Sequence, residues 1–269
     1  MTRPGGEATI VPVTSPSGTA DIASPADWPP GRVLVVAATY EERANLDVLV
    51  DRVLAADPAL QLLVVDDDSP DGTGAAALAR AAHEPRLHLL GRRGRRGLGG
   101  AILEGFDLAA RHGFAIAVNM DADLSHDPDD IPRLLAALEP VGGRPADVVV
   151  GSRRVPGGRT VGWPLWRHVV SRLVGFFTRR IVGVPVRDAS SGFRAVRLAT
   201  FAPLPRTFAT GYTFLEEMLW AVHRAGGRIV EVPITFTNRE RGSSKAGLRE
   251  SLVGGWRLVR LACAARLGG

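Results

Sequence analysis

The first folded part of the chain alternates β-branched apolar runs with segments whose apolar residues recur at helical spacing. The earliest run is VLVVAAT, at residues 33–39, and a continuous run of this kind is typical of a strand buried on both faces. In residues 42–55 the apolar side chains then recur every three or four positions, as on one face of a helix. This alternation limits the possible folds more than any other feature of the sequence.

The same pattern continues through the first half of the chain. Further strands are predicted at 61–67, 86–91, 114–121 and 146–153, with helices at 73–82, 99–111 and 128–138. Strands that alternate with helices of this length predict an α/β fold, in which a mostly parallel, Rossmann-like sheet carries helices on both faces. The second half is less regular and predicts helices at 165–182 and 214–225 and a strand at 227–236.

Composition divides the chain into three parts. Residues 1–30 are rich in Gly, Pro, Ser, Thr and Ala without a helical or strand period, which predicts a disordered leader. Residues 31–250 are expected to form one domain, and residues 251–269 an amphipathic, arginine-containing helical tail.

Several classes of protein are disfavoured. The single cysteine, Cys263, excludes an internal disulfide and favours a reducing, cytoplasmic setting. No apolar run is long enough to cross a bilayer, and the first residues do not resemble a secretory signal. The net charge of +5 suits anionic ligands or lipid head groups, whereas no nucleic-acid-binding motif is present.

Acidic clusters directly follow three of the predicted strands, at residues 39–42, 66–68 and 121–123. In parallel sheets, ligands bind beyond the carboxyl ends of the strands. We therefore expect the three clusters to meet at one edge of the sheet and to form a binding site there.

The Asp-Ala-Asp at 121–123 is the most informative cluster. Two carboxylates that flank one residue at a strand end can both reach a hard cation such as Mg²⁺ or Mn²⁺. An EF-hand is excluded, because His126 and Pro132 stand where its loop requires Gly and Glu. A solvated acidic loop remains an alternative. An aspartyl nucleophile would normally follow the first strand rather than the fourth.

Two other polar stretches lie near this edge. VVDDDSPDGT, at 64–73, predicts a turn and the start of a helix, and one of its carboxylates could accept a hydrogen bond from a ring N–H or a ribose hydroxyl. GRRGRRGLGGA, at 91–101, does not match a phosphate-binding loop and predicts a basic loop that leads into a helix.

Basic residues near the same edge are candidates for phosphate contacts. They are Arg153, Arg194, and the pair Arg239 and Lys245 in a Gly/Ser-rich loop. Guanidinium groups match phosphate oxygens well, although most surface arginines have no special role.

The ordered series ATYEERANL, VVDDDSPDGT, RGLGGA, MDADLSHDP, VVVGSRR, ASSGFR, GYTFLEEM and EVPITFTNRERGSSK resembles the family-2 inverting glycosyltransferases. It is most similar to the dolichol-phosphate or polyprenol-phosphate mannose synthases, over residues 32 to 250. One departure is Ala38, where members of that family usually have proline.

The resemblance implies a GT-A fold and transfer of mannose from GDP-mannose to a polyprenyl (dolichyl-type) phosphate, with inversion to a β-linked product. It also implies catalytic roles for Asp121, Asp123, Arg153 and Lys245, and a Mg²⁺ or Mn²⁺ ion held by Asp121, Asp123 and Ser125. The nucleotide sugar would contact Ala38, Tyr40, Glu42, Val65, Asp67, Asp121, Ala122, Asp123, Arg153, Arg239 and Lys245. The acceptor phosphate would contact Arg153, Arg167, Ser191 and Arg194.

A lipid acceptor requires access to a membrane. The predicted helices at 163–182 and 248–267 mix Trp, Phe, Val and Leu with Arg, as helices at a membrane interface do, although core packing with a basic outer face would give the same pattern. We expect a peripheral protein on the cytoplasmic face of the membrane.

Three alternative functions stay open on the sequence alone. One is a related transferase that uses UDP-glucose or another UDP-sugar. The second is a non-catalytic nucleotide-binding protein descended from such an enzyme, and the third a metal-dependent phosphohydrolase.

Overall fold

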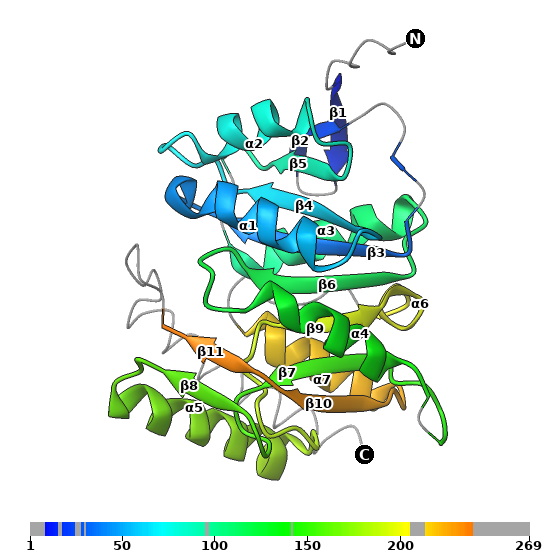
Figure 1. Ribbon diagram of the computed structural model, residues 1–269. Coiled ribbons are helices and arrows are strands. Elements are labelled where there is room, and N and C mark those ends of the chain that lie inside the picture. Colours follow the sequence, from blue (N-terminus) through cyan, green and yellow to red (C-terminus); the bar gives the residue numbers. More distant parts are fainter. Residues whose placement is uncertain are drawn as a thin grey trace.

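A nine-stranded sheet forms the centre of the molecule, in the order β1-β2-β5-β4-β3-β6-β9-β7-β10 (Figure 1). The computed structural model describes residues 9–15, 18–24, 28–29, 31–94, 97–140, 142–204 and 213–238, with backbone only for the first two segments. The strands are β1 (Thr9–Ser15), β2 (Gly18–Ser24), β3 (Val33–Thr39), β4 (Leu60–Asp66), β5 (Leu87–Gly91), β6 (Ile116–Asp121), β7 (Val148–Ser152), β8 (Arg159–Val161), β9 (Arg194–Arg197), β10 (Ile229–Pro233) and β11 (Thr235–Thr237).

Helices lie on both faces of this sheet, as the strand–helix alternation predicts. They are α1 (Arg43–Ala56), α2 (Thr73–Ala81), α3 (Leu98–Arg111), α4 (Ile131–Leu138), α5 (Leu165–Phe177), α6 (Leu198–Phe201) and α7 (Phe214–Arg224), with a 3₁₀ turn η1 (Pro128–Asp130) and a π turn η2 (Thr178–Val182). The helix predicted at 165–182 is therefore α5 followed by one wider turn.

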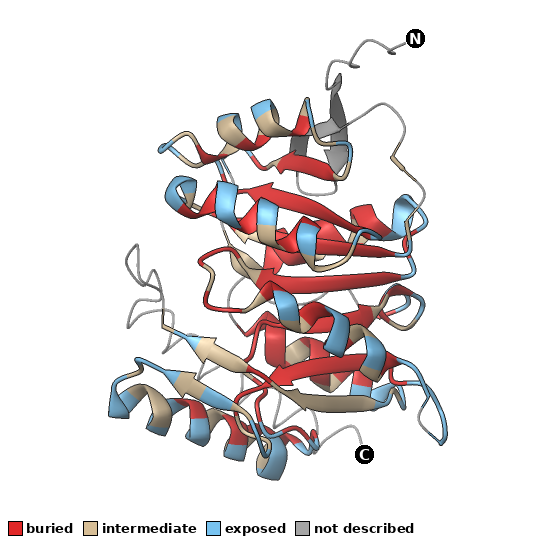
Figure 2. Ribbon diagram, viewed as in Figure 1, coloured by how far each residue is buried: buried red, intermediate tan, exposed pale blue. Residues whose placement is uncertain are grey.

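Alternate residues along each central strand enter two separate cores. In β3, Val33, Val35 and Ala37 pack with α1, α2 and α4 on one face of the sheet. Leu34 and Val36 pack with α3, α6 and α7 on the other. Strands β3 to β6 are accordingly buried almost throughout, while the outer surfaces of the helices are exposed (Figure 2). Burial on both faces explains why these strands read as unbroken apolar runs.

The sheet departs from the predicted parallel arrangement at β9. This strand lies between β6 and β7 and is antiparallel to both, whereas β3, β4, β5 and β6 are mutually parallel. The segment RAVR has four residues and an arginine at each end, so it is too short and too polar to show a recognisable strand pattern in the sequence.

Two segments within the predicted leader at 1–30 are strands. Residues 9–15 and 18–24 form an antiparallel hairpin, and β2 pairs with the edge of β5. The hairpin contains the β-branched residues of TIVPVTS, and its pairing with β5 satisfies backbone groups that an open edge strand would leave exposed.

Arg194, predicted to contact an acceptor phosphate, lies in the core instead. It is fully buried, and its guanidinium group donates to the carbonyl oxygens of Ala189, Ser191 and Leu215. Burial lowers the pKa of Arg194 to about 10 and raises the pKa of the nearby Glu216 to about 7. Every edge of the guanidinium is occupied by the protein, so Arg194 supports the chain rather than presenting a charge to a ligand.

A small second sheet, formed by parallel strands β8 and β11, lies beside α5 (Figure 1). None of the helices in the described part of the chain has the length and apolar character needed to span a bilayer. The predicted helical tail at 251–269 lies outside the described residues.

Candidate functional site

The parallel register brings three predicted clusters together at one edge of the sheet. Ala38, near the end of β3, is opposite Asp121 of β6 on one side and Val65 of β4 on the other. Thr39 is opposite Asp66, and its hydroxyl donates to the Asp66 carboxylate at 2.9 Å. The adjacency expected from the strand ends is therefore present, and the acidic residues of β4 and β6 flank β3.

The two aspartates of the Asp-Ala-Asp sequence differ in exposure. The side chain of Asp121 is 35% exposed. Asp123 is 9% exposed, and its Oδ1 accepts a hydrogen bond from the Ser125 backbone N–H at 3.0 Å. Ala122 between them is buried, so the loop turns its small residue inward while Asp121 reaches solvent.

His126 is a site residue that the sequence analysis missed. Its Nδ1 accepts a hydrogen bond from the Asp121 backbone N–H at 3.1 Å, and its ring stacks on Phe193 at 4.9 Å. Burial lowers its pKa, against the opposing effect of Asp121 and Asp123, so the ring is neutral and can accept that bond. His126 thereby fixes the backbone from which the Asp121 carboxylate extends.

Gly192 packs closely against the Asp121 carboxylate. A Cβ atom on Gly192 would lie 3.0 Å from Asp121 Oδ1, and the Gly192 carbonyl is held by the Asn119 side-chain amide at 2.5 Å. The described residues contain no group of three or more His, Cys, Asp or Glu side chains suited to a metal. Two carboxylates at a strand end, one of them 35% exposed and the other at the edge of a cavity, suit a Mg²⁺-like ion that takes its other ligands from waters and substrate phosphates.

The residues predicted to hold a nucleoside are spread around the β3–β4 side of this edge. Tyr40 and Glu42 are half-buried in the loop after β3. One Glu42 oxygen already accepts from the Asn45 amide at 2.8 Å. Val65 is fully buried among core residues, so its side chain supports the edge rather than facing a ligand.

Asp67 is used inside the protein. One oxygen forms an ion pair with the buried Arg92, and the other accepts from the Gly97 N–H at 2.8 Å. Burial raises the pKa of Asp67 even though Arg92 opposes the shift. The residue predicted to contact guanosine therefore also ties the loop between β5 and α3 to the end of β4. The sequence shows Arg92 only as one of several arginines in a basic loop, and that pattern does not reveal the buried pair.

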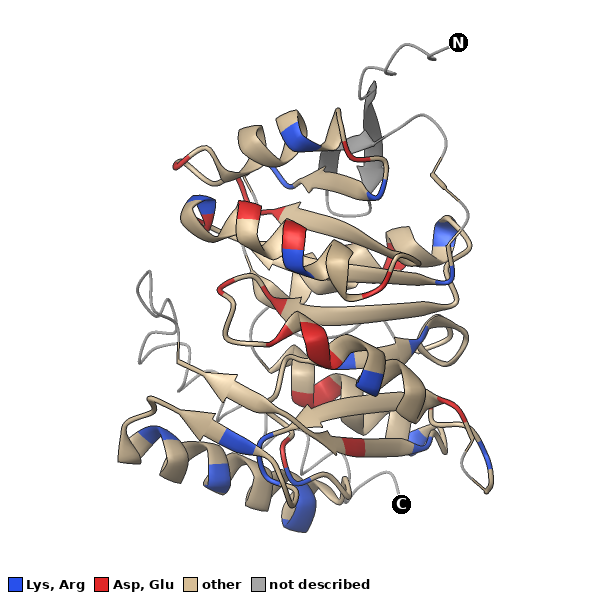
Figure 3. Ribbon diagram, in the orientation of Figure 1, with Lys and Arg blue, Asp and Glu red and all other residues tan. Residues whose placement is uncertain are grey.

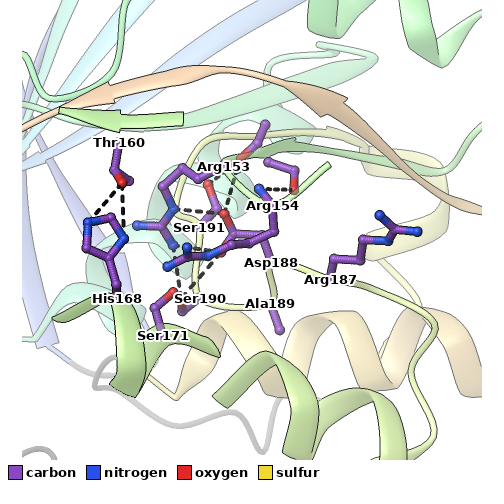
Figure 4. Close-up of polar contacts among 12 residues, drawn as sticks. Arg153, Arg154, Thr160, His168, Ser171, Arg187, Asp188, Ala189, Ser190 and Ser191 are labelled. Atoms are coloured by element: carbon purple, nitrogen blue, oxygen red, sulfur yellow. Dashed lines mark hydrogen bonds and ion pairs between the residues drawn. The ribbon is translucent and has the colours of Figure 1, made fainter. Parts of the chain in front are cut away.

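Arg153, which follows β7, is held from one side by Asp188 (Figure 4). Its Nε and Nη2 donate to the two Asp188 oxygens at 2.8 and 2.7 Å, and Nη2 also donates to the Ser190 hydroxyl at 3.0 Å. Ser191, predicted to contact the acceptor, instead donates its hydroxyl to the Gly151 carbonyl at 2.6 Å and is buried.

Trp163 lies between two of the predicted phosphate ligands. The Arg153 guanidinium carbon is 4.8 Å from the Trp163 ring centroid, and the Arg167 carbon is 5.2 Å from it. Phe236 also lies below Arg153, at 5.3 Å, and meets the His126 ring edge-on at 5.2 Å. Aromatic rings thus connect the arginines to the loop that carries Asp121 and Asp123.

Some buried donors near Arg153 have no hydrogen-bond partner within the described ranges. They are Nε and Nη2 of Arg154 and Nε1 of Trp163. Buried polar groups are normally satisfied, so these N–H groups indicate a place where an anion or water completes the structure. Arg239 and Lys245 lie outside the described residues.

A cavity of about 370 Å³ opens on the α1 side of the Asp-Ala-Asp loop. Asp123 and Ser125 line one part of it, and Asn45, Thr237 and Asn238 line another. Ser125, predicted as a metal ligand, is thus placed beside Asp123 at the boundary between this cavity and the sheet edge.

Comparison with known proteins identifies the family. The family model "Glycosyl transferase family 2" matches residues 34–202. The chain belongs to glycosyl transferase family 2. The undecaprenyl-phosphate mannosyltransferase of Micrococcus luteus is 44% identical over 80% of the chain and 87% of that protein. The polyprenol monophosphomannose synthase of Mycolicibacterium smegmatis is 43% identical over 83% of the chain and 85% of that protein. The dolichol-phosphate mannosyltransferase of Pyrococcus furiosus is 35% identical, over 80% and 59%.

Solved structures show the same fold. The glucosyl-3-phosphoglycerate synthase of Mycobacterium tuberculosis, crystallised with Mn²⁺, UDP and glucosyl-3-phosphoglycerate, aligns with a TM-score of 0.64 at 21% identity. The alignment covers 87% of this chain and 80% of that one. This family-2 glycosyltransferase accordingly has the GT-A fold that the sequence predicts.

Replacing Asp67 with Asn should destabilise the fold. It removes the carboxylate to which the buried Arg92 donates a hydrogen bond and leaves the 3.4 Å ion pair with Glu104, and breaking a buried pair costs about 3 kcal/mol of unfolding free energy. The matched control is Asp127→Asn, because Asp127 is 46% exposed where it pairs with Arg52 and such pairs contribute about 1 kcal/mol or less. Urea unfolding of both variants measures the difference. Equal, small losses would contradict the structural role of Asp67.

Proposed function

We propose that this protein transfers a mannosyl group from GDP-mannose to a polyprenyl phosphate and inverts the anomeric centre to give a β-linked product. The observation that carries the proposal is the placement of two sites side by side. A carboxylate edge around Asp121 lies next to an arginine cluster around Trp163, and the two are joined by His126 and Phe236. The names of the relatives, which include two polyprenyl-phosphate mannosyltransferases, support mannosyl transfer to a polyprenyl phosphate.

The chemistry needs few reactive groups from the protein. A phosphate monoester has a second pKa near 6, so at pH 7 the acceptor is largely an anionic nucleophile without a strong general base. Arg153 and Arg167 are placed to orient such a phosphate, because both guanidinium groups lie over the Trp163 ring. Attack from that side, opposite the departing diphosphate, inverts the sugar.

Asp121 and Asp123, with Ser125 beside them, would hold a Mg²⁺ or Mn²⁺ ion. When bound, such an ion neutralises the negative charge that builds on the departing diphosphate. The cavity lined by Asp123 and Ser125 fits this use. His126 and the Ser125 N–H keep the two aspartates in place for it.

A transfer assay tests the proposed function. Purified protein with labelled GDP-mannose, Mg²⁺ and polyprenyl phosphate in detergent or vesicles should yield a mild-acid-labile lipid product. Asp123→Ala should lower that yield by at least a hundredfold, because removing one electrostatic contact to developing charge costs about 10² to 10³ in rate. UDP-glucose in place of GDP-mannose tests the related UDP-sugar transferase. Product from UDP-glucose alone, or release of free sugar without acceptor, would contradict the proposal.

The acceptor's lipid chain is proposed to reach the site through a membrane against which α5 lies. Most of the exposed large apolar side chains in the described residues belong to this helix: Leu165, Trp166, Val169, Val170, Leu173 and Phe176, exposed by 48 to 79%. The opposite side of α5 carries the buried Ser171 and the half-buried Arg167. A bilayer in contact with the outer side would therefore place the head group near the arginine cluster.

The charge around α5 favours an anionic membrane surface. Residues 148–187 contain eight arginines and no aspartate or glutamate. Arg172, Arg179 and Arg180 are exposed on α5 and η2. Figure 3 shows basic positions in blue along α5 at the lower edge of the molecule. Apolar side chains flanked by arginines are typical of helices that lie in the interface of a membrane.

Replacing Leu173 and Phe176 together by Ser should weaken binding to vesicles that contain anionic lipid by at least tenfold, because both side chains lose the apolar contact. Vesicle flotation at low salt measures this. Val48→Ser is the matched control, because Val48 is 45% exposed on α1, away from α5, and its loss should leave flotation unchanged. Equal flotation of both variants would contradict membrane contact through α5.

A further inference from the structure

The Asp188–Arg153 pair is the most completely buried ion pair at the site. The side chains are 1% and 5% exposed. Asp188 receives three hydrogen bonds from Arg153: one from the backbone N–H at 2.8 Å, and two from the guanidinium group. One carboxylate thus fixes both the main chain and the side chain of Arg153, a much stronger constraint than an ordinary surface pair provides.

Asp188 is itself held from two other strands. Its backbone N–H and that of Arg187 donate to the Glu231 carboxylate of β10 at 2.9 and 2.8 Å. Ser191, three residues on, donates to Gly151 of β7 at 2.6 Å. The loop 187–191 is therefore held to β7 and β10 by hydrogen bonds. These bonds fix the position of the Asp188 carboxylate relative to the sheet.

Protein groups contact one edge of the Arg153 guanidinium group and lie near its faces. Asp188 and Ser190 take the Nε–Nη2 edge, while Trp163 and Phe236 lie within 4.8 and 5.3 Å of its carbon. The Nη1 atom makes no hydrogen bond to any described residue. Because Asp188 and Ser190 hold the Nε–Nη2 edge, the edge that carries Nη1 is available to a phosphate oxygen. The position of Asp188 sets the direction in which that edge points.

We propose that Asp188 is a positioning residue for the transfer reaction, which acts by holding the Arg153 guanidinium so that its free edge faces the reacting phosphate group. The inference rests on the proposed function, in which Arg153 contacts phosphate. It also changes the roles expected for the ASSGFR stretch. Ser191 and Arg194, predicted to bind the acceptor, hold the protein structure instead. Asp188, directly before this stretch, acts on the site through Arg153.

Positioning and charge predict opposite effects when Asp188 is neutralised. Asp188 is ionised, because its hydrogen bonds with Arg153 and the charge of that residue hold the pKa of Asp188 below its usual range. If its charge were all that mattered, Asp188→Asn would remove a repelling anion and lower the KM for the phosphate acceptor. If it positions Arg153, the same change misaligns the guanidinium in the transition state and lowers kcat.

Steady-state kinetics of Asp188→Asn with GDP-mannose and polyprenyl phosphate separates the two effects. We expect kcat to fall at least tenfold, the acceptor KM not to fall, and the Kd for GDP with Mg²⁺ to change less than twofold. The matched control is Asp147→Asn, because Asp147 is 8% exposed at the other end of β7 and accepts bonds from Thr200, Arg144 and Arg228. That control should lower stability with kcat unchanged.

A double-mutant cycle tests whether Asp188 acts through Arg153. In an Arg153→Ala background, Asp188→Asn should change kcat less than twofold, because the group that it positions is gone. Ser190→Ala removes the 3.0 Å bond to Nη2, together with the longer 3.5 Å contacts to Asp188 and Ser171. It should lower kcat two- to fivefold and serves if Asp188→Asn does not fold. An unchanged kcat in Asp188→Asn or Ser190→Ala, a lower acceptor KM alone, or independent effects in the cycle would overturn the inference.

A binding measurement separates this inference from the proposed function. Addition of inorganic pyrophosphate should shift the ¹⁵Nε–H NMR signal of Arg153, assigned through Arg153→Lys, in the wild type but not in Asp188→Asn. A wild type that makes no mannosyl lipid contradicts the proposed function alone. Equal pyrophosphate shifts in both proteins contradict the role of Asp188.

Discussion

Repulsion among carboxylates at one edge of a parallel sheet is the constraint on which the rest of this structure depends. The register of β3 with β4 and β6 places Asp66 and Asp121 on either side of the same strand end, with Asp67 and Asp123 next to them. Such a cluster is unfavourable unless each charge has a partner or a cation. Asp66 accepts bonds from Thr39 and Ser69, and Asp67 pairs with Arg92. The Asp121 carboxylate is 35% exposed and lies 3.7 Å from the buried His126 ring.

The arginine cluster on the other side of His126 brings positive charges together, which is also unfavourable unless partners offset them. Arg153 is buried, and its charge would be unfavourable without Asp188. Arg167 is half-buried and, among the described residues, meets the amide oxygen of Asn238 and the rings of Trp163 and Trp166. The two arginines thus differ in role: the first is fixed, and the second can follow its ligand. Their shared aromatic partner brings them to one place, where an anion would meet both.

Helix α5 connects that cluster with the surface. Much of α5 is exposed (Figure 2), and its exposed residues include the large apolar side chains of Trp166 and Leu173. Its inner side carries Ser171, whose hydroxyl is 3.5 Å from that of Ser190. The helix therefore packs on the same loop that holds Asp188. An apolar outer side of this size is unusual for a helix that packs only on its own domain, and it fits an enzyme whose acceptor is a lipid.

Local pattern was enough to predict the central fold. VLVVAAT predicts β3 with the bounds that the structure has, and the helical spacing in 42–55 predicts α1 within a residue. The edge at which Asp121 and Asp123 lie followed from parallel topology alone. The antiparallel β9 and the N-terminal hairpin were missed because their pairing partners, rather than their own sequences, make them strands.

The role of a side chain could be predicted only where it follows from the position of the residue at the end of a strand or in a motif. Arg153 and Arg167 were expected near a phosphate and do share one aromatic ring. Arg194 was expected there too, but burial reverses its role, because its charge is used by three carbonyl oxygens. His126, Asp188 and Trp163 gave no motif signal, since their importance comes from contacts with residues far along the chain.

The carboxylate edge is proposed to need both a cation and a diphosphate, and Mn²⁺ titration followed by electron paramagnetic resonance tests this most directly. We expect weak Mn²⁺ binding by the protein alone, binding at least tenfold tighter with GDP, and loss of that gain in Asp123→Asn. Mn²⁺ affinity that is independent of GDP, or equal in the wild type and Asp123→Asn, would contradict the account.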